Sequence, residues 1–313
     1  VASEINTAKN FSIAWITDTQ YLSENYPTYY DDMCQWIVDN KDVYNIKMVI
    51  HTGDMVNEPQ NRSQWENANH SMSILLENGI PYCWNAGNHD TIEGPWIGNQ
   101  FVTFNSTLMQ NKTYWVSDNA DSKNTAVKIQ ANNMTFLIIN IEFFADNDVI
   151  NWVNSVLDQY PTAKTIIGMH AYLDGQCGYS NWAKNFQTKV LDTHSNVFLT
   201  LSGHYGSEFG NQTCQTNRYE ILFNPQYSNN KTGSASIRIL TFDLDRDKIE
   251  IKTFSVLRNE FLIDRNNYYV IDLKCIRSQF EINVNNLILV LIIGLFVCLL
   301  ILSCTKFFGR FKK

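Results

Sequence analysis

The sequence has 313 residues, enough for one large domain or two small ones. Hydrophobic residues make up 44% of it and aromatic residues 13%, which excludes a disordered chain because the core material is ample. The formal net charge is -7 and the pI is about 5.4, so no excess of basic residues is present to wrap a nucleic acid.

Alternating strands and helices are predicted in the first third of the chain. Apolar runs that stop at polar residues predict buried strands at 11–17, 46–52 and 80–86. Between them, apolar side chains recur on one side of two helical stretches, 29–44 and 64–78. A strand–helix–strand order of this kind is typical of a parallel βαβ sheet.

The later part of the chain is richer in strands. Hairpin-like strands are followed by alternating helices and strands, and then mainly by strands; the expected strands are 113–116, 126–129, 135–141, 165–169, 197–201, 219–223, 236–243, 249–257 and 268–273, and the expected helices are 149–157 and 182–191. No repeat or long linker interrupts them. We therefore expect one α/β domain over 1–274.

The C-terminal end has a different composition. Residues 287–304 carry no charge, and a helix of that length is about 27 Å long, close to the ~30 Å hydrocarbon core of a bilayer. The run is apolar on all sides, so a single transmembrane helix is favoured over a buried core helix. Residues 275–286 would form a stalk, and the basic residues of 305–313 predict a cytosolic tail.

Several features favour an exported domain. The chain begins with Val1 rather than Met, as expected after removal of a signal peptide. Eight Asn-x-Ser/Thr sequons precede the apolar run and none follows it, which predicts N-glycans outside the cell or else chance in an Asn-rich chain; they lie at Asn10, Asn61, Asn69, Asn105, Asn111, Asn133, Asn211 and Asn230. We expect a single-pass protein of the cell membrane with its large domain outside.

The cysteines are compatible with an oxidising compartment. Cys177 and Cys214 lie in loop-like sequence and are favoured as a disulfide pair. Cys34 and Cys83 lie in apolar runs, so they are interpreted as buried thiols.

Polar side chains follow five of the predicted strands at the point where each strand ends. In an open α/β sheet, ligands bind at the carboxyl ends of strands. Singly, each segment could be a turn, a cap or a core histidine. Together they supply oxygen and imidazole donors that suit Zn, Mn or Fe; the segments are Asp18-Thr19-Gln20, Gly53-Asp54, Gly87-Asn88-His89-Asp90, Met169-His170 and Gly203-His204. No thiol is among them, which argues against a structural cysteine-type zinc site.

This series resembles the signature of the calcineurin-like metallophosphoesterases, which is Asp-x-His, Gly-Asp, Gly-Asn-His-Asp/Glu, a His, and Gly-His-x-His. The resemblance implies a four-layer α/β sandwich, in which two mixed β-sheets are flanked by helices, and a centre for two divalent ions. The chain most resembles the secreted or membrane-anchored members of this family.

The resemblance implies a role for each matching residue. Asp54 would bridge both ions, and Asn88, His170 and His204 would complete one site. Asp18 and Gln20 would belong to the other site. His89 would contact the phosphate and assist the leaving oxygen, so that His89, Asn88 and Asp54 are the expected catalytic residues.

Two positions depart from the signature, and both concern the same ion. Gln20 stands where a histidine is usual, and an amide oxygen is a weaker donor than imidazole for Zn or Fe. Gly206 stands where the last histidine is expected, and it has no side chain. The site of Asp18 and Gln20 is therefore expected to bind its ion weakly.

The predicted function is metal-dependent hydrolysis of a small phosphomonoester or phosphodiester, such as a nucleotide or a lipid head group, at the cell surface. Metal ions would lower the pKa of a bound water, and the hydroxide would attack phosphorus. A nucleic-acid polymer is not expected as substrate, because the part of the chain before the basic tail is acidic. The alternative is a catalytically weakened surface receptor, adhesin or assembly subunit. The sequence leaves the oligomeric state open.

Overall fold

The computed structural model describes residues 10–92, 94–119, 121–176, 178–205, 212–215, 218–227 and 232–273. The chain divides into two units, Val1–Asp272 and Leu273–Lys313, and every element below belongs to the first. No helix within the described ranges is long and apolar enough to cross a membrane. The predicted stalk (275–286), membrane span (287–304) and basic tail (305–313) lie outside those ranges and stay predictions.

The first sheet contains the beginning and the end of the domain. Its order is β13-β12-β11-β1-β2-β3, and β14 also pairs with β12; the bounds are β1 Asn10–Ile16, β2 Ile46–His51, β3 Tyr82–Trp84, β11 Ser236–Asp243, β12 Lys248–Ser255, β13 Glu260–Leu262 and β14 Tyr268–Asp272. Strands β1, β2 and β3 are parallel, whereas β11 runs antiparallel to β1. The predicted βαβ arrangement is therefore confirmed, and the sheet is mixed.

The second sheet contains the middle of the chain. Its order is β4-β5-β6-β7-β8-β10-β9; the bounds are β4 Trp115–Asn119, β5 Asn124–Ala131, β6 Met134–Ile141, β7 Lys164–Met169, β8 Val197–Ser202, β9 Gln212–Gln215 and β10 Tyr219–Leu222. Strands β6, β7, β8 and β10 are parallel, and the outer strands are antiparallel. The parallel strands thus form one edge of the first sheet and the centre of the second.

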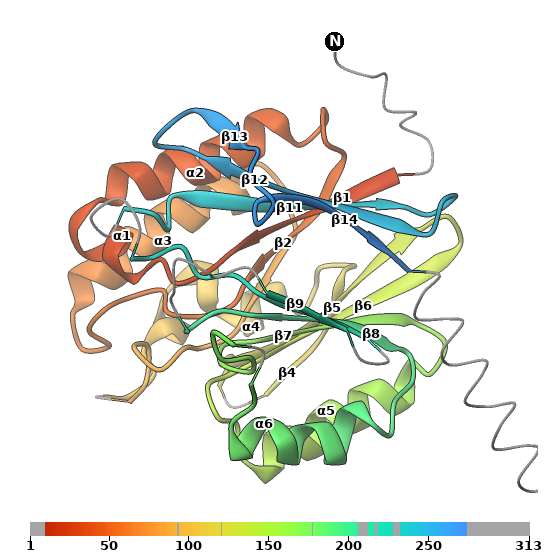
Figure 1. The fold of residues 1–313 in the computed structure, drawn as a ribbon. Coiled ribbons are helices and arrows are strands. Elements are labelled where there is room, and N and C mark those ends of the chain that lie inside the picture. Colours follow the sequence, from red (N-terminus) through yellow and green to blue (C-terminus); the bar gives the residue numbers. More distant parts are fainter. Residues whose placement is uncertain are drawn as a thin grey trace, which may run out of the picture. The chain divides into compact units, whose positions relative to one another are not determined.

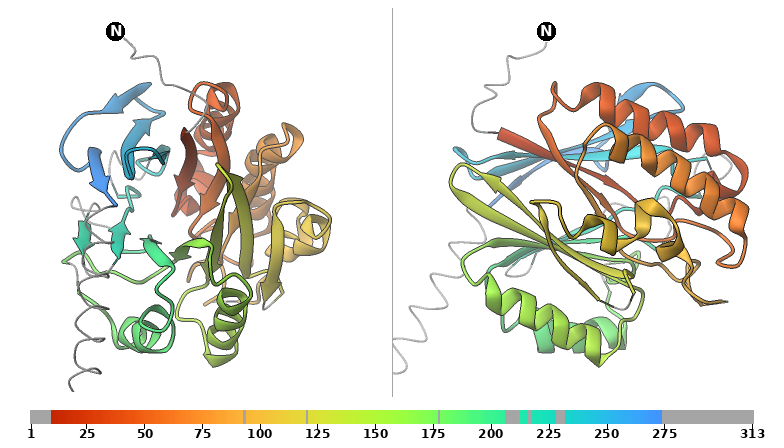
Figure 2. Two further views of the ribbon diagram at one scale, coloured as in Figure 1. Left: turned by 90° about the vertical axis from the view of Figure 1, so that its right-hand side faces the viewer. Right: turned by 180° about the vertical axis from the view of Figure 1, so that it is seen from behind.

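Helices cover the outer face of each sheet (Figures 1 and 2). The first sheet carries α1, α2 and α3, which span Gln20–Asn25, Pro27–Asn40 and Arg62–Glu77. The second carries α5 (Asn147–Gln159) and α6 (Asn181–Phe186), the latter continued by the π-helical segment η3 (Gln187–Leu191). The expected arrangement of two mixed sheets flanked by helices is confirmed.

Short elements are where the structure differs from the sequence-based expectations. Helix α1 has six residues and strand β13 three, which is too few for either period to show in the sequence. The same holds for β9 and for the short helices between β3 and β4, which are η1 (Gly98–Gln100), η2 (Val102–Phe104) and α4 (Ser106–Met109). The two predicted thiols, Cys34 and Cys83, are buried and free, as expected. Cys177 lies outside the described residues, so its pairing with Cys214 stays a prediction.

Aromatic rings join the two sheets. Phe11 of β1 stacks on Phe242 of β11, with ring centroids 4.7 Å apart. Phe136 of β6 meets Phe11 edge-on at 4.9 Å and Phe242 at 5.6 Å. Because these rings lie in neighbouring layers, their packing holds the ends of the two sheets together.

We expect Phe136→Ala to lower the free energy of unfolding by about 3–5 kcal/mol, because it leaves a cavity between the sheets. Urea denaturation measures the loss. The control is Ile263→Ala at a side chain that is 87% exposed, which we expect to change stability by less than about 0.5 kcal/mol. Equal effects of the two substitutions would contradict this account of the sheet interface.

Candidate metal centre

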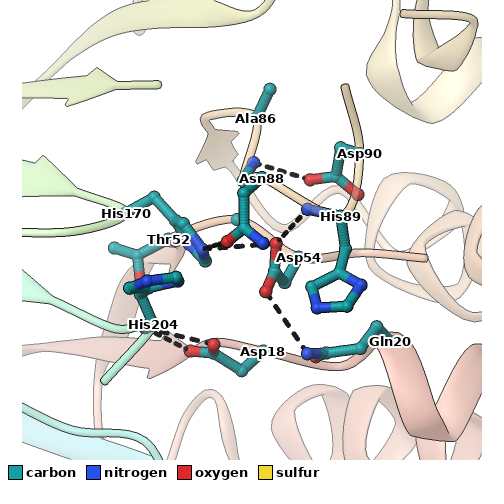
Figure 3. Close-up of polar contacts among 12 residues, drawn as sticks. Asp18, Gln20, Thr52, Asp54, Ala86, Asn88, His89, Asp90, His170 and His204 are labelled. Atoms are coloured by element: carbon teal, nitrogen blue, oxygen red, sulfur yellow. Dashed lines mark hydrogen bonds and ion pairs between the residues drawn. The ribbon is translucent and has the colours of Figure 1, made fainter. Parts of the chain in front are cut away.

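The predicted site residues converge where strands of both sheets end (Figure 3). Asp18, Asp54 and Asn88 follow β1, β2 and β3 of the first sheet. His170 and His204 follow β7 and β8 of the second sheet. The site is therefore built across two sheets, with its two histidine ligand candidates on one and its carboxylates on the other.

Asp54 makes contacts in both directions. Its Oδ1 accepts the backbone N–H of His89 at 3.0 Å and lies 3.2 Å from Nε2 of His170. Its Oδ2 accepts a hydrogen bond from the Gln20 amide at 3.3 Å. Burial acts to raise the pKa of Asp54, but the charge and hydrogen bond of His170 lower it below its usual value. Asp54 is thus held as a carboxylate.

His170 is oriented by the backbone of β2. Its Nδ1 donates to the carbonyl of Thr52 at 2.8 Å, which leaves Nε2 directed at Oδ1 of Asn88, 2.9 Å away. Burial acts to lower the pKa of His170, but the Asp54 carboxylate raises it to about 9. Nε2 faces two acceptor oxygens, so it must carry either a proton or a cation between itself and them.

One cluster of side chains fits a divalent metal ion. Ligand atoms of Asp54, His170 and His204 all lie within 4.8 Å of one another. Burial and the positive charge of His170 lower the pKa of His204 to about 4, which keeps its imidazole neutral and able to ligate. A carboxylate, an amide oxygen from Asn88 and two imidazoles form a donor set that suits Zn, Mn or Fe.

Asp18 is fully buried and lies against the backbone of His204. Its carboxylate accepts the backbone N–H of His204 at 3.1 Å and the side-chain amide of Asn224 at 2.9 Å. Thr17 donates its hydroxyl hydrogen to the same carboxylate at 2.5 Å. Burial raises the pKa of Asp18 to about 7, the Asp54 charge adds to the rise, and His170 opposes it. A cation nearby would favour the ionised form.

Two residues of this centre carry no sequence motif. Asn224 and Gln226 follow β10 and are buried, with 2% of each exposed. Gln226 accepts a hydrogen bond from the Gln20 amide at 2.5 Å, and Asn224 also donates to the carbonyl of His204 at 2.9 Å. The available signal was a polar Asn-Pro-Gln segment after a predicted strand, the same signal as at the other strand ends. Gly206, by contrast, lies outside the described residues.

His89 and Asp90 have distinct positions. His89 is half-buried, and its Nδ1 lies 3.0 Å from the carbonyl of Asn57, which leaves Nε2 as the second ring nitrogen. Asp90 accepts the backbone N–H groups of Met55 at 2.9 Å and Gly87 at 2.7 Å. Asp90 therefore ties the Asp54 loop to the Asn88 loop and caps no helix.

The backbone is in unusual conformations at the centre. Asp18, Asp54 and His204 have positive φ angles of 52°, 56° and 64°. A left-handed non-glycine residue costs on the order of 1 kcal/mol, and such residues cluster at functional sites. Gly87 allows the closest approach, because a Cβ there would lie 2.1 Å from Oδ1 of Asp54.

Comparison with known proteins assigns a family to this arrangement. The sequence profile of the family described as calcineurin-like phosphoesterase matches residues 11–226. Among curated proteins, the uncharacterized protein YvnB of Bacillus subtilis (strain 168) is 29% identical over 296 residues, which cover 91% of this chain. Those residues cover 22% of YvnB, so the chain spans about a fifth of that relative.

Solved structures share the fold. A dimetal phosphatase from Danio rerio superposes with a TM-score of 0.54 at 14% identity, covering 83% of this chain and 99% of its own. Purple acid phosphatase PPD1 from yellow lupin (Lupinus luteus) seeds has a TM-score of 0.53 at 11% identity, and the match covers 85% of this chain and 54% of the lupin chain. GAP50, the anchor in the inner membrane complex of Plasmodium, has a TM-score of 0.53 at 14% identity, and the match covers 87% of this chain and 94% of GAP50. At these identities the likeness shows the fold alone.

We expect Gly87→Ala to abolish metal-dependent stabilisation, because the new methyl group must displace Asp54. For the unsubstituted chain, adding Mn²⁺ or Zn²⁺ at about 100 times its dissociation constant should raise the unfolding free energy by about 2.7 kcal/mol. Thermal unfolding with and without metal measures both effects.

The matched control is Gly94→Ala, where the nearest atom is Cγ of the flexible Gln60 side chain. Its metal response should equal that of the unsubstituted chain. A full metal response in Gly87→Ala would contradict the placement of the centre at Asp54.

Proposed function

We propose that this chain, which belongs to the calcineurin-like phosphoesterase family, hydrolyses a small phosphoester with divalent metal bound at its strand ends. Family membership makes the domain a metallophosphoesterase domain, in the class of phosphoric ester hydrolases. The observation that carries the proposal is the convergence within 4.8 Å of donor atoms from the buried Asp54 and His170 and the half-buried His204. Bound metal would supply a hydroxide nucleophile and neutralise charge on the phosphate.

The protein side chains would divide the remaining work. With a divalent ion bound, His170 would give up its proton, and it would join the already neutral His204 in presenting imidazole nitrogens as ligands, with Asn88 adding an amide oxygen. Asp54 would lie at the junction of the two half-sites, because its two oxygens face opposite sides. A second ion would be held on the side of Asp18 and Gln20.

His89 would assist departure of the leaving group. Its backbone N–H is fixed on Asp54 and its Nδ1 on the carbonyl of Asn57, so the ring is held in one orientation at the centre. Nε2 would hold a phosphate oxygen or donate a proton to the departing alkoxide. The half-buried position of His89 supports this role, since a substrate must reach it from solvent.

Aromatic side chains beside the centre support a substrate with a flat or apolar group. The Phe143 ring packs 5.0 Å from the His204 ring, and Phe144 stacks on Phe143 at 4.1 Å. Phe144 is 41% exposed and also stacks on Trp182 at 5.8 Å. We propose a nucleotide or a lipid head group as the substrate, because either could contact this aromatic surface.

The proposed location is the cell surface, with residues 287–304 as the membrane anchor. The apolar length of that run and the basic residues after it support the proposal. Asn111 and Asn133, two of the predicted glycan acceptors, are exposed in the folded domain.

We expect Asp54→Asn and His89→Ala to lower the rate of phosphoester hydrolysis by about 10²–10⁴-fold each, because they remove the central carboxylate and the proton donor. The rate is measured on chromogenic phosphomonoesters and phosphodiesters and on nucleotides, with added Mn²⁺ or Zn²⁺. Controls are Asp158→Asn and His70→Ala, whose side chains are 78% and 72% exposed.

Unchanged activity in either test variant would contradict the assignment. A chain that binds metal and hydrolyses no ester in the panel would instead favour the structural role of a surface receptor or assembly subunit. The departures at Gln20 and Gly206 are the observations that would then explain the lost activity.

A further inference from the structure

The half of the centre that lacks histidines contains a second buried amide. Gln226 lies beside Gln20, and their head groups meet at 2.5 Å. The Gln20 amide nitrogen is also 3.3 Å from Oδ2 of Asp54. Gln20 is fully buried and Gln226 is 2% exposed, so three polar head groups converge away from bulk solvent.

This arrangement leaves one polar atom unexplained. Oε1 of Gln20 is buried and has no hydrogen-bond partner. A buried acceptor without a partner is costly, and such atoms in folded proteins point to an unseen ligand or ion. In this structure the Gln20 amide nitrogen faces Oδ2 of Asp54 and Oε1 of Gln226. A 180° rotation of the amide would exchange these two hydrogen bonds for a cluster of three oxygens. A divalent cation bound among the three oxygens would satisfy all of them at once.

The loop after β10 holds Gln226 in place before any ion binds. The backbone N–H of Gln226 donates to the Asn224 side chain at 3.0 Å. The Asn224 amide in turn donates to Asp18 and to the carbonyl of His204, both at 2.9 Å. Asn224 therefore positions Gln226 relative to both halves of the centre.

We propose that Gln226 is a metal ligand, and that with Gln20 and Asp54 it forms an oxygen-only half-site for a second divalent ion. Gln226 would supply the ligand that Gly206 cannot, since glycine has no side chain. Asp18, buried beside the same half-site, would add negative charge. The inference deepens the proposed function and rests on the metal centre proposed above.

The donor chemistry sets the metal that this half-site takes. Carboxylate and amide oxygens favour hard ions such as Mn²⁺ or Mg²⁺, whereas the imidazoles of His170 and His204 favour Zn²⁺ or Fe. The two halves would therefore bind different metals when both are offered. A mixed centre follows, with Zn²⁺ on the histidines and Mn²⁺ on the glutamines.

The test measures metal content and Mn²⁺ affinity of the full chain. Metal-free protein is equilibrated with one equivalent each of Zn²⁺ and Mn²⁺, so that Zn²⁺ taken up by the histidines leaves none for the second site, and bound metal is counted by mass spectrometry of the elements. Mn²⁺ binding is followed by electron paramagnetic resonance. We expect one Zn²⁺ and one Mn²⁺ per chain.

Substitutions of Gln226 distinguish a metal ligand from a residue that only supports the local structure. Gln226→Leu should weaken Mn²⁺ binding by about tenfold or more and leave bound Zn²⁺ unchanged. Gln226→Glu, which has nearly the same shape, should tighten Mn²⁺ binding by about tenfold because it adds a charge to the ligand set. Gln187→Leu, at a half-buried glutamine that donates to Tyr172 at 2.8 Å, should leave both ions unchanged.

Two results would overturn the proposal: one ion per unsubstituted chain, or Mn²⁺ affinity that is the same in Gln226→Glu as in the unsubstituted chain. Gln226→Glu decides the matter even where Gln226→Leu fails to fold. If the proposed metal centre itself is wrong, the result differs: the unsubstituted chain then binds no Zn²⁺ at His170 and His204 either.

Discussion

The buried carboxylate of Asp54 is the contact on which the centre depends. It is reached by His170 from the second sheet, by the His89 backbone from the loop after β3, and by Gln20 from α1. Each of these groups is far from Asp54 in the sequence or lies in a different layer. A negative charge this deep must be compensated, and the single histidine charge is shared with Asp18 nearby. A divalent ion would compensate both carboxylates at once.

The backbone conformation at the centre also serves to bring side chains to Asp54. Asp18, Asp54 and His204 adopt left-handed conformations just beyond the ends of their strands, and their side chains lie close together in Figure 3. Gly53 beside them is needed for two reasons: its φ angle is +93°, and a methyl group there would lie 2.7 Å from the His170 ring. The aromatic packing of Phe11, Phe136 and Phe242 then fixes the distance between the layers that supply the two halves.

The sequence predicted most of this arrangement because the regular elements repeat a local pattern. Apolar runs gave the central strands, and the polar residues that end them indicated which edge would carry chemistry. Asn224 and Gln226 follow the same rule after β10, yet they fall outside any motif, and their importance depends on contacts with Asp18 and Gln20 more than 200 residues away. Helix α1 was missed because six residues are too few to establish a period.

The account is tested most directly by diffraction from crystals of the domain grown with Zn²⁺ and Mn²⁺, with anomalous scattering recorded at the absorption edge of each metal. The account predicts a Zn²⁺ peak among Asp54, Asn88, His170 and His204. Ordered protein with no anomalous peak among these side chains, at metal concentrations that saturate any binding seen in solution, would contradict it.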